Sequence, residues 1–124
     1  MDITIYGGTF VLDGGVGAAG IGSGGSANKN DSFKEKVDGA NIYYEPASAV
    51  GDITIEGGTF EIRGRSGGAG IGSGARGGCE NITFNGGTLC NVIGNYSNDD
   101  PYGAAGIGSG YMAYCGNITF YDGI

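Results

Sequence analysis

The sequence predicts an all-β protein: a short parallel β-solenoid (β-helix) of about three coils plus a final strand, forming one domain over residues 1–124. Two observations carry this prediction. A strand-like block ending in a Gly-Gly pair recurs along the chain, and a second, glycine-rich block follows each full copy. Glycine occupies 30 of the 124 positions, and because these glycines are periodic they indicate a repeat architecture and not disorder.

The first block marks the start of each coil. Its copies are DITIYGGTF at 2–10, DITIEGGTF at 52–60, NITFNGGTL at 81–89 and NITFYDGI from Asn117. Copies two and three start 29 residues apart, which we take as the length of one coil. The other spacings, 50 and 36, are longer, and we assign the extra residues to two loop insertions, 25–50 and 94–102.

Each coil is expected to hold three short extended segments. In the first, apolar residues alternate with a threonine, as in Ile3-Thr4-Ile5, which is typical of a strand with one buried face. A second strand follows the Gly-Gly corner. It is less regular in the third coil, because the position two residues after Leu89 holds Asn91 and the apolar Val92 comes one residue later. The third segment places one isoleucine per coil at equivalent positions: Ile21, Ile71 and Ile107.

Glycine is expected at the corners and along the third segment, where backbones approach closely and some residues need φ > 0. The second block reads GAAGIGSG at 17–24, GGAGIGSG at 67–74 and GAAGIGSG at 103–110. Spacings of three, such as Gly17 to Gly20, leave a polyproline-II-like glycine helix as the alternative for this segment.

The blocks DITIEGGTF and GGAGIGSG together resemble the glycine-rich β-helical repeats of large bacterial cell-surface proteins, especially those of Gram-positive gut bacteria. The resemblance covers about 75 of the 124 residues and omits the two insertions. It implies stalks, adhesin-like surfaces or carbohydrate-binding modules. The chain departs from the pattern because a strand follows Met1 directly, with no leader or anchor. We therefore expect either an excerpt of a longer surface protein, at the cell surface, or a complete chain in the cytoplasm.

Composition excludes several function classes. The formal net charge is −7, which disfavours direct binding to nucleic acid or to an anionic membrane surface. The chain has no histidine, so it has no Ser-His triad and no histidine-ligated zinc. No apolar run is long enough for a membrane-spanning helix. We expect no cofactor and no enzymatic activity.

Recognition is expected at the insertions, since irregular loops on a rigid scaffold commonly carry it and exposed tyrosines suit sugars and protein partners. The alternative is that these aromatic side chains only cover the flank of the solenoid. The candidate binding residues are Phe33, Tyr43, Tyr44, Tyr96, Tyr102, Tyr111 and Tyr114. Asp99 and Asp100 are weak candidates for a metal site, against the simpler interpretation of solvated loop charge.

The three cysteines do not indicate a disulfide framework. Cys79 and Cys115 occupy the position that Val50 holds in the preceding coil, so we expect a buried, reduced Val-Cys-Cys ladder. A disulfide between these two cysteines is the alternative, because neighbouring coils lie within disulfide range. Cys90 is offset from them.

The leading functional hypothesis is a non-enzymatic structural or binding module, a segment of a surface protein with a glycan or protein ligand. The alternatives are a free-standing acidic interaction or inhibitor protein, of phage origin and acting on a host protein, and a fragment of a carbohydrate-active enzyme. Both ends of the solenoid are expected to be uncapped, which favours a homo-oligomer or contact with neighbouring repeats.

Overall fold

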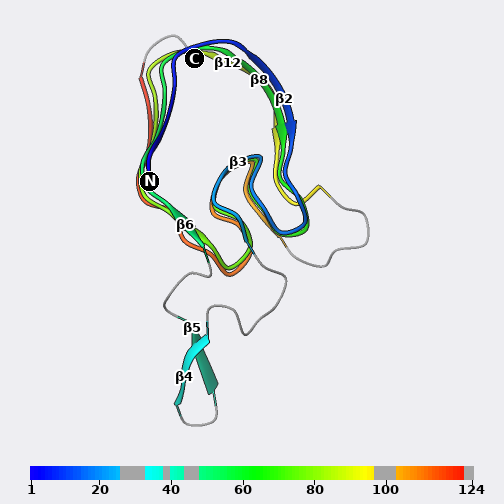
Figure 1. The fold of residues 1–124 in the computed structure, drawn as a ribbon, viewed down its shortest axis with the longest axis vertical. Helices are drawn as coiled ribbons and strands as arrows, with labels where there is room; N and C mark the ends of the chain where they lie inside the picture. Colours follow the sequence, from blue (N-terminus) through cyan, green and yellow to red (C-terminus); the bar gives the residue numbers. More distant parts are fainter. Residues whose placement is uncertain (26–32, 38–39, 44–47, 97–102, 122–124) are drawn as a thin grey trace.

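The fold is all-β, with parallel strands in stacked sheets, as in the β-solenoid class (Figure 1). The structure, a computed structural model, describes residues 1–25, 33–37, 40–43, 48–96 and 103–121, with side chains described outside 33–37 and 40–43. Within these ranges it contains no helix, and so none that could span a membrane. The predicted fold class is confirmed at this level.

The first sheet is built from the first repeated block. Its strands are β1 (Ile3–Ile5), β7 (Ile53–Ile55), β11 (Ile82–Phe84) and β14 (Ile118–Phe120), parallel and in that order. Equivalent residues pair directly, so that Thr4, Thr54, Thr83 and Thr119 lie in one row. In β7 and β11 the apolar side chains are fully buried and the threonine between them is partly exposed, which confirms the predicted alternation.

The second sheet contains β2 (Thr9–Asp13), β8 (Thr59–Arg63) and β12 (Thr88–Ile93), with β8 in the middle. The pairing of β12 with β8 shifts between Leu89 and Asn91, which leaves Cys90 as the extra, exposed residue of a β-bulge. The irregularity predicted for this strand is therefore confirmed.

The third sheet lies inside the arc formed by the first two (Figure 1). Its strands are β3 (Ile21–Gly22), β9 (Ile71–Gly72) and β13 (Ile107–Gly108). Gly72 has φ 139°, and a Cβ there would lie 1.8 Å from the carbonyl oxygen of Gly108, so no other residue fits. The polyproline-II alternative does not hold, because Gly17 and Gly67 have φ of 79° and 91°.

A fourth, two-stranded sheet was not expected from the sequence. It pairs β6 (Ala49–Val50) with β10 (Gly78–Cys79), and Tyr114 adds an isolated bridge to Gly78. Two-residue strands are too short to show an alternating pattern. Ala49 and Val50 fall inside the segment 25–50 that we predicted as an insertion, yet they pair within the stack.

The segment 25–50 also contains an antiparallel pair, β4 (Phe33–Val37) with β5 (Ala40–Tyr43), where the sequence predicted an irregular loop. In Figure 1 this pair lies away from the stacked sheets. Two strands that are close in sequence can pair with each other as a hairpin and need no equivalent strand in another coil. The repeat pattern therefore does not predict this pair.

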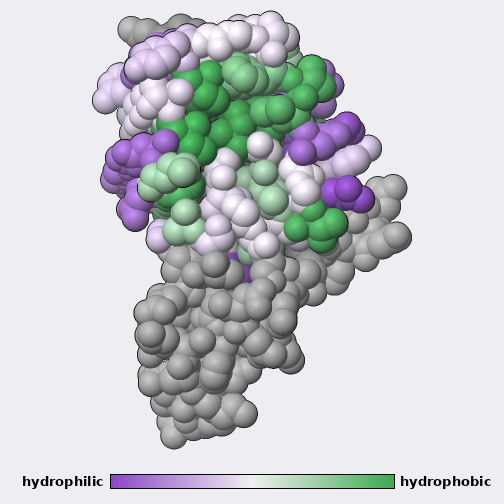
Figure 2. All heavy atoms as spheres, in the orientation of Figure 1, coloured by the Kyte–Doolittle hydropathy of each residue, from purple (hydrophilic) through white to green (hydrophobic). Residues whose placement is uncertain are grey.

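The core runs along the stack as rows of identical or similar side chains. The largest fully buried side chains are Phe60, Phe84, Ile53, Ile55, Ile62, Ile71 and Ile82. Phe10 stacks on Phe60 with ring centroids 5.2 Å apart, and Phe84 stacks on Phe120 at 4.7 Å, and in both pairs the ring planes are within 4° of parallel. In Figure 2, which looks along the stack, apolar side chains gather in the middle of the end turned to the viewer.

We expect the substitution Gly72→Ala to destabilise the protein by about 3 kcal/mol or more, because the added methyl would meet the Gly108 carbonyl at an unfavourable φ. Gly15→Ala is the matched control, since nothing lies within 4 Å of a Cβ built there. It should change the free energy of unfolding by less than about 1 kcal/mol. Urea unfolding of both variants checks this, and equal losses would contradict the close approach at β9.

Candidate binding face

The outward side of the first sheet carries three parallel rows of polar side chains, which we call the outer face. The rows follow from strand alternation: every second residue points outward, and the register puts equivalent residues side by side. The Asx row is Asp2, Asp52, Asn81 and Asn117. The threonine row is Thr4, Thr54, Thr83 and Thr119. The tyrosine row is Tyr6, Glu56, Asn85 and Tyr121.

The Asx row holds the backbones of successive strands together. The Asp2 Oδ1 atom accepts a hydrogen bond from the Asp52 N–H at 2.9 Å. The Asp52 Oδ1 atom accepts from the Asn81 N–H at 3.0 Å, and the Asn81 Oδ1 atom accepts from the Asn117 N–H at 2.9 Å. The contact needs a short side chain with an oxygen acceptor, which Asp and Asn at these four positions supply.

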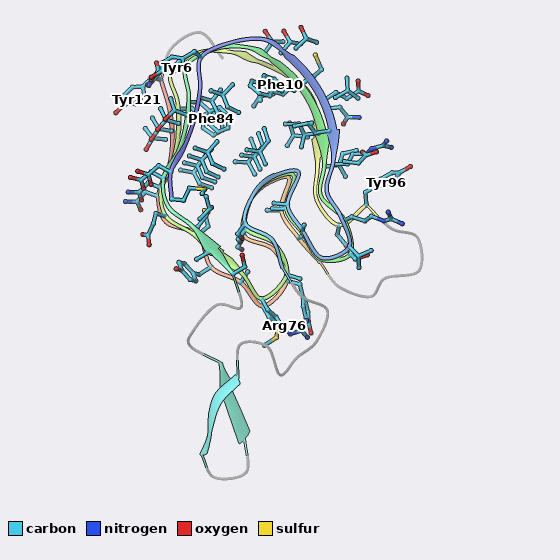
Figure 3. All side chains as sticks on the ribbon, viewed as in Figure 1. Tyr6, Phe10, Arg76, Phe84, Tyr96 and Tyr121 are labelled. Carbon is cyan, nitrogen blue, oxygen red and sulfur yellow. The ribbon has the colours of Figure 1, made fainter. Side chains whose placement is uncertain are left out.

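All four side chains of the tyrosine row are exposed. Its register is set by backbone bonds just past the strands: the N–H groups of Glu56, Asn85 and Tyr121 donate to Ile5, Ile55 and Phe84. Tyr6 and Tyr121 are 80% and 62% exposed, and both point outward on the same side of the stack (Figure 3). Between them the Asn85 Nδ2 group donates to Glu56 Oε1 at 3.0 Å.

This arrangement suits an extended ligand lying along the stack. At a strand spacing of about 4.8 Å, the three steps from Tyr6 to Tyr121 span roughly 14 Å. Two aromatic side chains therefore flank a carboxylate and an amide, beside a row of hydroxyl groups. Tyrosine offers a large apolar surface, and the groups between offer hydrogen-bond donors and acceptors.

Several sequence-predicted binding residues fall where the structure gives no side chains. Phe33 lies in β4 and Tyr43 in β5, in the part of the chain described by backbone alone. Tyr44, Tyr102, Asp99 and Asp100 lie outside the described residues. Among the residues that are described, no three Asp, Glu or Cys side chains are grouped to hold a metal ion.

Tyr96 lies on the second sheet side, away from Tyr6 and Tyr121 (Figure 3). The guanidinium of Arg63 lies over its ring, 4.3 Å from the centroid. Arg63 also donates to Asp13 through Nε at 2.7 Å and through a second nitrogen at 3.2 Å. The hydrogen bond to Asp13 raises the pKa of Arg63 above its usual value, so this guanidinium stays charged.

Tyr111 and Tyr114 pack against the stack. The guanidinium of the buried Arg76 lies 5.1 Å from the centre of the Tyr111 ring, and the Arg76 N–H donates to the Tyr111 carbonyl at 2.7 Å. The ring of Tyr114 covers Gly78, because a Cβ on Gly78 would lie 2.3 Å from it. Tyr96, Tyr111 and Tyr114 therefore each have their own partner in the stack, and the structure does not gather them with the tyrosine row.

Neither Tyr6 nor Tyr121 is among the sequence-predicted binding residues. The signal was present in the repeats, because both residues follow the strand of the first block at the outward position that Glu56 and Asn85 occupy in the other copies.

Cys79 lies between Val50 and Cys115, as the predicted ladder requires. Cys79 pairs with Val50 in the fourth sheet and is fully buried, while Cys115 is partly exposed. Burial, followed by a hydrogen bond to the Cys115 thiol, raises the pKa of Cys79 to about 12. All three cysteines are thiols in this structure.

Comparison with protein-family models, with curated proteins and with solved structures finds no match for this chain.

The raised pKa of Cys79 predicts a loss of stability in alkali. Below pH 9 the thiol is protonated in both states, but between pH 9.0 and about 12 only the unfolded chain loses this proton. The free energy of unfolding should therefore fall over this range by at most about 1.4 kcal/mol per pH unit from this group.

Cys79→Val is the matched variant for this prediction, because Val50 holds the same position on the neighbouring strand. Urea unfolding of both proteins at pH 8, 10 and 11 isolates the cysteine from other groups that titrate in alkali. The stability of the native protein should fall faster with pH than that of the variant. Parallel curves would contradict the prediction.

Proposed function

We propose that this chain is a non-enzymatic binding module, a β-solenoid of about three coils and a final strand, whose outer face binds a linear glycan along the stack. Its two loop insertions would lie within 25–50, before the strand Ala49–Val50, and within 94–102. A binding module of this kind agrees with the resemblance to the repeats of bacterial surface proteins, from which a surface location follows as part of the proposal. The ligand is a β-1,4-linked polysaccharide, bound without chemical change.

The tyrosine row is the observation that supports the proposal. A β-1,4-linked sugar chain is linear and advances per sugar by a distance close to the strand spacing, so successive sugars match successive strands. Tyr6 and Tyr121 would each stack on one sugar ring. The hydroxyl groups of the sugars between them would bond to Glu56, Asn85 and the threonine row.

The ligand's chemistry follows from charge as well. A neutral sugar chain needs no cationic contacts, whereas nucleic acid would need several, and the chain carries 6 basic against 13 acidic residues. The outer face holds the carboxylates of Asp2, Asp52 and Glu56 and no lysine or arginine. A neutral polysaccharide therefore fits this face better than an acidic one.

The proposal predicts that Tyr6→Ala and Tyr121→Ala each weaken glycan binding about 10-fold, since each removes one stacking partner. The measurement is affinity electrophoresis followed by titration calorimetry with soluble cellulose derivatives, xylan and glucomannan. Both side chains are largely exposed, so the melting temperature should stay within about 2 °C of the native value.

Tyr96→Ala is the control, because this tyrosine is also exposed but lies over Arg63 on another sheet. It should leave glycan binding unchanged. An equal loss in the control would overturn the assignment to the outer face. If the native protein bound no glycan while capturing a protein partner, the free-standing interaction protein would be favoured instead.

We also propose that copies of the chain associate through the ends of the first sheet. In the inner strands the N–H of Ile53 donates to Asn81 and the N–H of Glu56 donates to Ile5. By the same pattern, the edge of β1 would offer the Asp2 carbonyl and the Tyr6 N–H to the Ile118 N–H and the Phe120 carbonyl on β14 of a second copy. The outer face would then continue from one copy to the next.

Light scattering under reducing conditions over a concentration series tests self-association, with an apparent mass that rises with concentration as the expected result. Thr4→Pro is the informative variant. The Thr4 N–H points away from β7, so proline should leave the fold intact but block pairing at this edge. A native protein that stays monomeric throughout, or a variant that associates equally, would overturn the proposal.

A further inference from the structure

The cysteines of the fourth sheet lie opposite each other at the C-terminal end of the stack. The Cys79 N–H donates to the Tyr114 carbonyl at 3.1 Å, and the Gly116 N–H donates to the Cys79 carbonyl at 3.2 Å. These two bonds, with the parallel bridge between Gly78 and Tyr114, put residue 115 directly beside residue 79. Neighbouring strands lie about 4.8 Å apart, within the Cα separation that a disulfide spans.

The two thiols also influence each other. Cys115 is, after burial, the next cause of the raised pKa of Cys79, and the Cys115 thiol donates to the carbonyl of the neighbouring Glu80 with its sulfur 3.9 Å from the oxygen. Cys115 packs against the buried core that contains Cys79 and Val50. Residue 115 follows a single bridge and belongs to no strand, so its backbone can move toward Cys79 without breaking a sheet.

We propose that Cys79 and Cys115 form a disulfide site that fastens the last strand of the first sheet to the stack under oxidising conditions. β14 is the strand that the disulfide would stabilise, since it begins three residues after Cys115. Among the strands that the structure describes, β14 pairs with β11 alone, and its inward-pointing Ile118 and Phe120 are 40% and 50% exposed. A covalent link beside it limits the opening of this edge.

Oxidised glutathione supplies the oxidant in the reaction that we propose. Cys115 is the more accessible sulfur, and as a thiolate it attacks one sulfur of glutathione disulfide and releases one glutathione thiolate. Cys79 then loses its proton to solvent and attacks the Cys115 sulfur, which expels the second glutathione thiolate. Two protein thiols become one disulfide, and glutathione disulfide is reduced to two glutathione thiols, which take up the two protons.

Burial makes the second step the slow one. Because the pKa of Cys79 is raised to about 12, little of its thiolate is present near neutral pH. Closure should therefore accelerate by about tenfold for each pH unit between pH 7 and 9, since the thiolate fraction rises in that proportion.

The experiment uses the full chain carrying Cys90→Ser, which removes the exposed thiol of the β-bulge as a competitor. The protein is equilibrated with mixtures of reduced and oxidised glutathione at pH 8. The expected product has lost two hydrogen atoms by intact mass. Chymotrypsin, which cleaves after Phe84 and Tyr111, should release peptides containing Cys79 and Cys115 as one linked pair.

The linked form should melt about 10 °C or more above the reduced form, and a reducing agent should abolish the difference. Cys79→Val in the same background is the matched control and should show neither the mass loss nor the rise. The native chain is mapped in parallel, so that the test does not depend on how Cys90→Ser folds.

Two results would overturn the proposal. One is a lasting glutathione adduct on Cys115 with Cys79 still open to alkylation after denaturation. The other is a linked pair that leaves the melting temperature unchanged, because the bond would then not fasten the edge. Neither result affects the glycan proposal, since the outer face lies on another sheet.

Discussion

Parallel, in-register hydrogen bonding between successive strands is the constraint on which the rest of this structure depends. Each strand of the first sheet pairs with the equivalent strand of another coil, so that Thr lies beside Thr, and Ile or Phe beside Ile or Phe. The side chains of the inner strands β7 and β11 therefore have near copies of themselves on both neighbouring strands. Such rows tolerate flat apolar, small or hydrogen-bonding side chains, as in the stacked Phe10 and Phe60. They also explain the side-chain-to-backbone ladders, in which Asp52 bonds to the next strand as Asp2 does.

In the third sheet, the in-register stacking restricts which residues the sequence can hold. It folds inside the arc of the first two sheets, so its strands lie close to other backbone on several sides (Figure 1). A Cβ atom at Gly72 would clash with the Gly108 carbonyl, and one at Gly64 would clash with the carbonyl of Ala69 in the same coil. Small buried serines complete the packing, since Ser23 and Ser73 accept bonds from the N–H groups of Gly74 and Gly110. The high glycine content is thus a consequence of an infolded backbone.

In a stack of this kind, side chains that could bind a ligand lie in rows along the stack. The outer face needs no loop to position Tyr6, Glu56, Asn85 and Tyr121, because strand pairing fixes their spacing. A rigid row matches a linear, repeating ligand with little loss of side-chain freedom on binding. The same regularity brings Cys79 beside Cys115, so the proposed binding face and the proposed disulfide both arise from residues that the repeat places at equivalent positions.

The sequence by itself determined the all-β class, the apolar rows and the Val50–Cys79 ladder, because a repeat with period-two alternation admits few other arrangements. It also indicated the irregularity at Cys90. It did not reveal that Ala49 and Val50 form a strand of the stack and not part of an insertion, nor that Tyr96 and Tyr111 would lie against Arg63 and Arg76. The repeats place Tyr6 and Tyr121 at one outward position, but the degree to which the two side chains are exposed, and the burial of Cys79 beside a partly exposed Cys115, were decided only by the tertiary structure. These properties depend on how closely segments that are remote in the chain pack against each other. A local sequence pattern does not encode such distances.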